Sequence, residues 1–122
     1  MWDGVNRRQC PRALYPCLIK VKSSTPPGPP ILTHTENISL GGVRVVIPRK
    51  IEALAEVELE IDLKDTLPPV LAEGIVRRAE ELAGSGSGRP RHYDTGIKFT
   101  NLNLEDKRRI EIIVTHILKK RS

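Results

Sequence analysis

Ten consecutive residues, 55–64, alternate strictly between apolar and charged side chains. The apolar set is Ala55, Val57, Leu59, Ile61 and Leu63, and the charged set is Glu56, Glu58, Glu60, Asp62 and Lys64. Successive side chains of a strand point to opposite faces of a sheet. The pattern therefore predicts a strand with one face in a core and the other face solvent-exposed and acidic.

Five further segments have the length and composition of strands: residues 13–21, 31–38, 43–47, 70–79 and 93–100. The period then changes, because Ile110, Ile113, Val114, Ile117 and Leu118 follow the spacing of one helix face. Asn103 is placed as the N-cap of a helix predicted over 104–121. Six short strands before one amphipathic helix predict an all-β chain, a six-stranded antiparallel barrel with the C-terminal helix packed on it.

Two segments interrupt this order. Residues 22–30 contain four prolines and a glycine and are predicted to form a loop. Residues 82–90 contain Gly-Ser-Gly-Ser-Gly and are predicted to form a flexible hairpin loop. We expect two parts in the chain: a flexible N-terminal arm, 1–12, and a single barrel domain, 13–122.

Several protein classes are excluded or disfavoured by simple counts. No run approaches the roughly 20 apolar residues that span a bilayer, and no apolar segment follows Met1 as in a secretory signal. Two cysteines do not make a disulfide scaffold. The expected setting is the reduced cytoplasm.

Charge is distributed unevenly along the chain. Residues 1–30 have a net charge of +4, residues 31–88 of −4 and residues 89–122 of +5. Basic ends favour an anionic partner such as a nucleotide, a nucleic acid or a membrane surface. A solvated surface with a basic tail explains the same numbers.

The first candidate binding motif is a group of arginines near the N-terminus. Arg8 and Arg12 are four residues apart, and Arg7 directly precedes them. A guanidinium presents five donors in a planar fork, which fits phosphate oxygens and the O6/N7 edge of guanine. By itself the spacing is more typical of a solvated basic terminus.

The second candidate motif follows the strand predicted at 31–38. It reads Asn37-Ile-Ser39-Leu-Gly41-Gly42. Asn37 and Ser39 are two apart and are expected on one face, where both could hydrogen-bond a base edge or a phosphate. Gly42 suits a position with a positive φ or a close backbone approach. An ordinary turn between strands is the alternative.

Together and in this order, the two motifs resemble those of the PilZ domain family, Arg-x-x-x-Arg followed by (Asp/Asn)-x-Ser-x-x-Gly. The run from Asp94 to Phe99 and the closing helix also resemble the second half of a PilZ domain, so the resemblance covers nearly the whole chain. It implies a six-stranded barrel that binds cyclic di-GMP, a bacterial second messenger, as a ligand-switched receptor module.

The resemblance also implies a role for each motif residue. Arg8 and Arg12 would hold phosphates and guanine faces, Asn37 and Ser39 would contact the ligand from the barrel surface, and Gly41 and Gly42 would form the turn beneath it. Arg7 could stack on a second nucleotide, so we expect a stacked dimer of cyclic di-GMP. Asn37 stands where many members have Asp, which favours somewhat weaker binding because charge-assisted hydrogen bonds are stronger.

Two other functions are compatible with parts of this sequence. A PilZ-like module that binds only protein remains open, with an unknown downstream protein as partner in either case. A small-barrel nucleic-acid binder is disfavoured by the scarcity of aromatic residues and by the acidic strand. No residue pattern suggests catalysis, a cofactor or a P-loop, and Cys10, Cys17 and the histidines lack zinc-site spacing.

Overall fold

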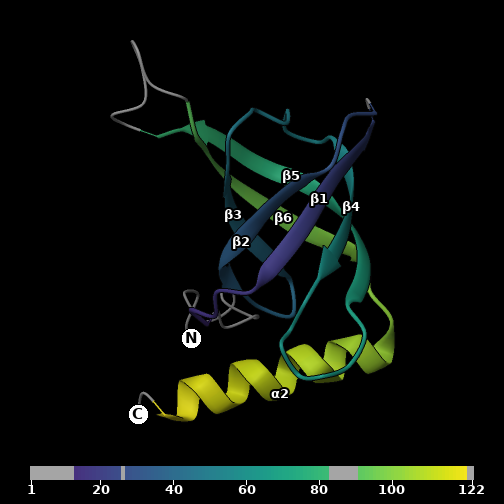
Figure 1. Cartoon of the computed structure of the whole chain (residues 1–122), viewed down its shortest axis with the longest axis vertical. Helices are drawn as coiled ribbons and strands as arrows, with labels where there is room; N and C mark the ends of the chain where they lie inside the picture. The colour runs from purple at the N-terminus through teal and green to yellow at the C-terminus, as the bar shows by residue number, and fades with distance from the viewer. Residues whose placement is uncertain (1–12, 26, 83–90, 121–122) are drawn as a thin grey trace, which may run out of the picture.

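The computed structural model describes residues 13–25, 27–82 and 91–120. Six antiparallel strands form a closed barrel, and one helix lies across its lower end (Figure 1). The elements are β1 (Leu18–Thr25), β2 (Ile31–Ile38), β3 (Gly42–Ile47), β4 (Glu56–Ile61), β5 (Val70–Glu81), β6 (Tyr93–Asn101) and α2 (Leu104–Lys120). The predicted barrel and C-terminal helix are therefore confirmed.

The barrel closes through two pairings between strands that are not neighbours in the sequence. The strand order around the ring is β1-β2-β3-β6-β5-β4. The last strand, β6, lies between β3 and β5, and β1 pairs with β4 to complete the ring. Every strand thus has two partners, and no edge of the sheet is left unpaired.

The core is aliphatic and fills the inside of the barrel. Residues 55–64 alternate in burial as the sequence predicts, with the five apolar side chains inside. β1 contributes Ile19 and Val21, and β3 contributes Val43, Val45 and Ile47. Cys17 is also buried, as expected for a small apolar side chain, and its Sγ lies 3.4 Å from Thr35 Oγ1.

The predicted bounds of the first strand, and of the loop that follows it, are wrong. Pro16 has no backbone N–H, and the ladder of β1 begins only at Leu18. Lys22 and Ser23, predicted as loop, pair with Glu58 and Val57 of β4. The prolines restrict the chain from residue 26 onward, so they do not prevent strand pairing before that point.

Other bounds shift less. β2 matches its prediction, β3 and β6 each gain one residue, and β5 extends to Glu81. β4 ends at Ile61 instead of residue 64, because Asp62 and Lys64 enter a turn in which Lys64 has a φ of 61°. Of the predicted hairpin loop, residues 83–90 lie outside the described residues.

Helix α2 begins where its cap was predicted. Asn103 Oδ1 accepts a hydrogen bond of 2.8 Å from the backbone N–H of Asp106. Ile110 and Val114 are buried, whereas His116 is exposed, as its position off the apolar stripe predicts. Within the described residues, no helix combines the length and the hydrophobicity of a membrane crossing.

One arginine ties α2 to the connection between β4 and β5, which reaches down to the helix in Figure 1. The Arg109 guanidinium donates to both carboxylate oxygens of Asp65, at 3.0 and 2.9 Å, and to the carbonyl of Pro68 at 2.8 Å. It also donates to Asp106 at 2.9 Å. The hydrogen bonds from Arg109 to Asp65 hold the pKa of the Asp65 carboxyl below its usual value.

Candidate functional site

Ser39 organises the turn that joins β2 to β3. Its Oγ accepts hydrogen bonds from the backbone N–H groups of Gly41, at 3.1 Å, and Gly42, at 3.2 Å. Its own N–H donates to the Gly42 carbonyl at 2.9 Å. The side chain is buried, so in this structure the hydroxyl is engaged by the turn itself and does not lie open on the barrel surface with Asn37.

Gly42 is required by a close backbone approach. A Cβ at this position would lie 2.0 Å from the Ile97 carbonyl oxygen and 3.1 Å from Lys98 Cα, both on the paired strand β6. Gly41 accepts a hydrogen bond of 2.8 Å from the Phe99 N–H, which ties the same turn to β6. Of the two reasons proposed for Gly42, the close approach is the one that the structure supports.

A β-bulge places Asn37 on the outside of the barrel. Thr35 pairs with Val45 and Asn37 pairs with Arg44, so Glu36 is an extra residue in β2. The bulge shifts the inside–outside alternation by one residue, and Ile38 enters the core although Thr35 is also buried. Asn37 is half-buried, beside the Ser39–Gly42 turn and next to Arg44.

The N-terminal end of the described chain is fixed beside this turn. The N–H of Ala13 donates to the Ile38 carbonyl at 2.9 Å, and the N–H of Ile38 donates to the Ala13 carbonyl at 3.0 Å. Ala13 is fully buried there. Arg7, Arg8 and Arg12, with the predicted arm 1–12, lie outside the described residues. Arg12 directly precedes Ala13, so the motif of arginines leads into the strand pair next to Asn37.

A charged cluster that the sequence did not predict lies on the outer face of the barrel, beside Asn37. Asp94 Oδ1 and Oδ2 accept from Arg44 at 2.6 and 3.1 Å, and Arg78 approaches Asp94 at 3.5 Å. Gly96, the cross-strand partner of Arg44 and Arg78, would place a Cβ with no atom within 4 Å. The outer face therefore has an open position between two arginines, in register with Asn37.

Electrostatics fix the shape of this cluster. Its hydrogen bonds to Asp94 raise the pKa of Arg44, so the guanidinium remains charged and oriented by the carboxylate. The alternation of side chains along β3 and β6 is enough to predict that Arg44 and Asp94 point to the same face of the sheet. Their contact depends on how the two strands are aligned in the β3–β6 pair. Sequence spacing does not supply the register.

Metal and thiol chemistry find no support in the described part of the chain. Among residues 13–25, 27–82 and 91–120, no three His, Cys, Asp or Glu side chains are grouped as a metal site requires. Burial is the main cause that raises the pKa of the Cys17 thiol, which disfavours the reactive thiolate.

Comparisons with known proteins agree with this fold. The family model of the PilZ domain matches residues 6–116. The PilZ domain of YcgR from Escherichia coli, solved with c-di-GMP, has a TM-score of 0.70 at 12% identity and covers 94% of both chains. The MrkH–c-di-GMP complex of K. pneumonia has a TM-score of 0.72 at 18% identity, over 94% of this chain and 54% of that one.

A third structure, the inhibitor of motility MotI/DgrA from Bacillus subtilis, has a TM-score of 0.69 at 18% identity. The match covers 51% of the MotI/DgrA chain. The chain therefore spans about half the length of MotI/DgrA and of MrkH. At these identities the likeness concerns the fold alone. No curated protein sequence matches the chain.

Proposed function

Because the chain belongs to the PilZ domain family, we propose that it is a bacterial cytoplasmic receptor module for cyclic di-GMP. The observation that carries the proposal is the Ala13–Ile38 pairing. It connects the segment that ends in Arg12 to the strand end that bears Asn37. This pairing supports a site to which both halves of the motif, about 25 residues apart in the sequence, contribute.

Each motif residue then has a distinct part in binding. Arg8 and Arg12 supply donors to phosphate oxygens and guanine edges. Asn37 contacts the ligand from the outer face. Ser39 acts through the turn that it holds. Gly42 allows this turn to approach β6 closely, and Gly41 adds no side chain that would obstruct the ligand.

Binding acts as a switch in this proposal. Without ligand, the arm 1–12 is loose; with ligand, the arm closes over the Asn37–Gly42 turn and presents a new surface to a downstream protein. The size of the effect is limited by the difference in ligand affinity between the open and closed states. A third arginine, Arg7, stacks on a second nucleotide, which gives a stoichiometry of two ligands per chain. No catalytic step and no cofactor are assigned.

Titration calorimetry of cyclic di-GMP into the chain, with GTP as the control ligand, tests the proposal. We expect saturable binding of cyclic di-GMP and none of GTP. The double variant Arg8→Ala/Arg12→Ala should lose at least 100-fold in affinity, because each charge-assisted contact contributes about 1.5–3 kcal/mol. Its thermal stability should stay unchanged.

The matched control is Arg91→Ala/Arg108→Ala, which removes the same charge from exposed sites elsewhere. It should bind as the wild type does. Equal affinity of the Arg8/Arg12 variant and the control would show that the arginine motif is not the site. Absence of heat at high ligand concentration would favour a PilZ domain that binds only protein.

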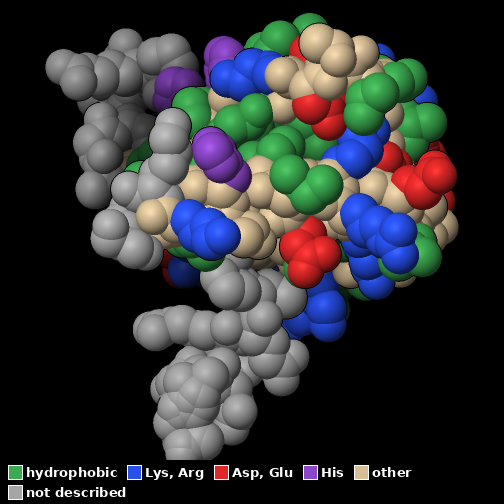
Figure 2. All heavy atoms as spheres, turned by 90° about the horizontal axis from the view of Figure 1, so that it is seen from below, with side chains coloured by type: hydrophobic (Ala, Val, Ile, Leu, Met, Phe, Trp, Pro, Cys, Tyr) green, Lys and Arg blue, Asp and Glu red, His purple; other side chains and the backbone are tan. Residues whose placement is uncertain are grey.

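The face of the molecule at the α2 end gives little support to a nucleic-acid interface. Figure 2 views the molecule from the α2 end, where basic side chains are interspersed with acidic and apolar ones. A nucleic-acid backbone requires a continuous basic stripe.

A further inference from the structure

The middle of β6 has an open position on the outer face of the barrel. Gly96 stands there, and a Cβ at this residue would meet no atom within 4 Å. Because side chains alternate along a strand, Asp94 and Lys98 are its neighbours on the same face. Gly96 is itself partly exposed, so bare backbone is accessible to solvent between two charged residues.

Two arginines flank this position from the neighbouring strands. Arg44 on β3 and Arg78 on β5 are both cross-strand partners of Gly96. Arg44 donates to Asp94 at 2.6 and 3.1 Å, and Arg78 Nη2 lies 3.5 Å from Asp94 Oδ2. The two guanidinium groups therefore converge on one carboxylate beside Gly96, and Asp94 closes one end of the open position.

The two arginines are held to different degrees. Arg44 binds both oxygens of Asp94, and its side chain is 36% exposed. Arg78 is 53% exposed, and its contacts to Asp94 and Glu80 are at 3.5 and 4.0 Å, the outer limit for such interactions. Arg44 is thus fixed in place, whereas Arg78 can turn its donors to a ligand over Gly96.

The β3–β6 pair connects this position to the proposed ligand site. Gly42, at the end of the Asn37–Gly42 turn, pairs with Lys98, and Arg44 pairs with Gly96. These are successive outward pairs of the same ladder, about 7 Å apart along the strands. A ligand bound at the turn could therefore reach the open position.

The charges around the open position suit a base better than a phosphate. The two arginines face two carboxylates, Asp94 and Glu80, so their charges are largely compensated. A phosphate would be repelled by these carboxylates, whereas a neutral base would not. Guanine presents acceptors at O6 and N7, which the planar fork of an arginine matches, and its flat face can pack against a guanidinium.

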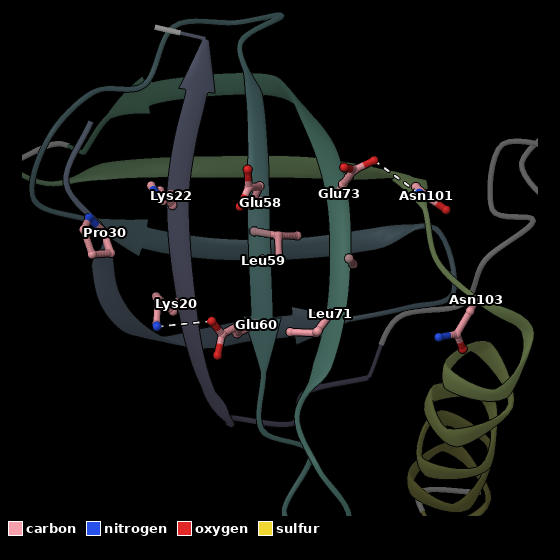
Figure 3. A pocket seen from close by; sticks show the side chains of 11 residues that line it. Lys20, Lys22, Pro30, Glu58, Leu59, Glu60, Leu71, Glu73, Asn101 and Asn103 are labelled. Atoms are coloured by element: carbon pink, nitrogen blue, oxygen red, sulfur yellow. Dashed lines mark hydrogen bonds and ion pairs between the residues drawn. The ribbon is translucent and has the colours of Figure 1, made fainter. Parts of the chain in front are cut away.

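The hollow on the outer face of β1, β4 and β5 offers a different chemistry (Figure 3). It has a volume of about 630 Å³. Lys20 is paired with Glu60 there at 3.2 Å, and Glu58 faces Glu73 across the β4–β5 pair. Adjacent carboxylates disfavour an anionic ligand, so this hollow is a poor alternative site for a cyclic dinucleotide.

We propose that a guanine base of the bound cyclic di-GMP lies over Gly96 and that Arg78 donates to its O6/N7 edge. This inference rests on the cyclic di-GMP binding proposed above. Arg44, held by Asp94, forms the wall of the position on the β3 side. Arg78 distinguishes guanine from adenine, because adenine has a donor where guanine has the O6 acceptor.

Titration calorimetry of cyclic di-GMP into the full chain and two variants tests the inference. Gly96→Leu fills the open position and should raise the dissociation constant at least about tenfold, because the base can no longer lie there. Arg78→Ala should raise it at least about fivefold, the lower end of what a bidentate arginine–guanine contact contributes. Unchanged melting temperatures verify that both variants fold.

Matched controls are Thr115→Leu, which adds bulk, and Arg108→Ala, which removes an arginine, both at exposed positions of α2. Both should bind as the wild type does. Cyclic di-AMP is the second ligand, and we expect the wild type to prefer cyclic di-GMP. Arg78→Ala should narrow this preference, whereas a merely structural role of Arg78 would weaken the binding of both ligands equally.

The outcomes separate this inference from the receptor function. If the wild type binds cyclic di-GMP and Gly96→Leu and Arg78→Ala bind it equally well, the base does not lie over Gly96, although the receptor function stands. An unchanged preference for cyclic di-GMP in Arg78→Ala would overturn the role of Arg78 in the same way. A wild type that does not bind cyclic di-GMP would overturn the receptor function and this inference together.

Discussion

Two strand glycines of this chain differ sharply in what a side chain would meet. A methyl group at Gly42 would collide with the Ile97 carbonyl, whereas one at Gly96 would enter open space. We expect Gly42→Ala to lower the free energy of unfolding by about 1–3 kcal/mol, as overpacking does. Gly96→Ala should change it by less than about 0.5 kcal/mol. Urea denaturation of both variants gives the comparison, and equal midpoints would contradict the close approach.

Asn37 is the residue at which the proposed ligand site departs from the Asp that many family members carry. We expect Asn37→Asp to tighten cyclic di-GMP binding about three- to tenfold, because an ionised acceptor forms stronger hydrogen bonds to guanine N–H groups. Asn37→Ala should weaken binding by a similar factor. The measurement is calorimetry at fixed ionic strength. Weaker binding by the Asp variant would show that Asn37 lies nearer to the phosphates than to a base.

At this scale the sequence predicted identities better than contacts. The Asn103 cap and the buried Cys17 follow from residue type and spacing. That Ser39 binds backbone N–H groups of its own turn does not, because a serine hydroxyl suits a turn and a ligand equally well. Arg44 and Asp94 are 50 positions apart, and only strand register brings them together.

The connection between β4 and β5 contains two of the three non-glycine residues with a positive φ in the described part of the chain. Lys64 and Thr66 have φ values of 61° and 66°, a conformation that costs a non-glycine residue roughly 1–2 kcal/mol. Asp65 lies between them and receives two hydrogen bonds from Arg109. The ion pair with α2 therefore offsets the cost of this turn and fixes the helix against the barrel.

The Arg109–Asp65 contact makes part of the stability dependent on pH. Arg109 lowers the pKa of Asp65 in the folded chain, so the contact stabilises the fold above the ordinary carboxyl pKa, and this is lost as pH falls through the lower, folded pKa. We expect Asp65→Asn to cost about 1.5–3 kcal/mol at pH 7. The difference from wild type should shrink below about pH 4.

Urea unfolding of wild type and Asp65→Asn at pH 7 and pH 3 measures this difference. Glu52→Gln, in an exposed ion pair, is the control and should change stability by less than about 0.5 kcal/mol at either pH. A constant difference between wild type and Asp65→Asn across this range would mean that the charge of Asp65 is not what stabilises the turn.

The element boundaries show where sequence patterns lose their force. Alternation located all six strands, because their buried faces are mainly aliphatic. It did not locate the bulge at Glu36, since an extra residue leaves no mark in the composition. It also ended β1 too early, because the polar residues Lys22 and Ser23 belong to a strand whose partner is far away in the sequence.

For the molecule as a whole, the strand count and the change of period were enough to predict a barrel closed by a helix. The ring order was not predictable from alternation, because which strands pair depends on long-range packing.

The position of β6 also has a consequence for how the chain is made. The ring stays open between β3 and β5 until residues 93–101 are available to fill it. Twenty residues separate the end of β5 from the end of β6, which is roughly one to four seconds of translation. During that interval a nascent chain has two unpaired edges, and closure from both sides by the final strand ends this exposure in one step.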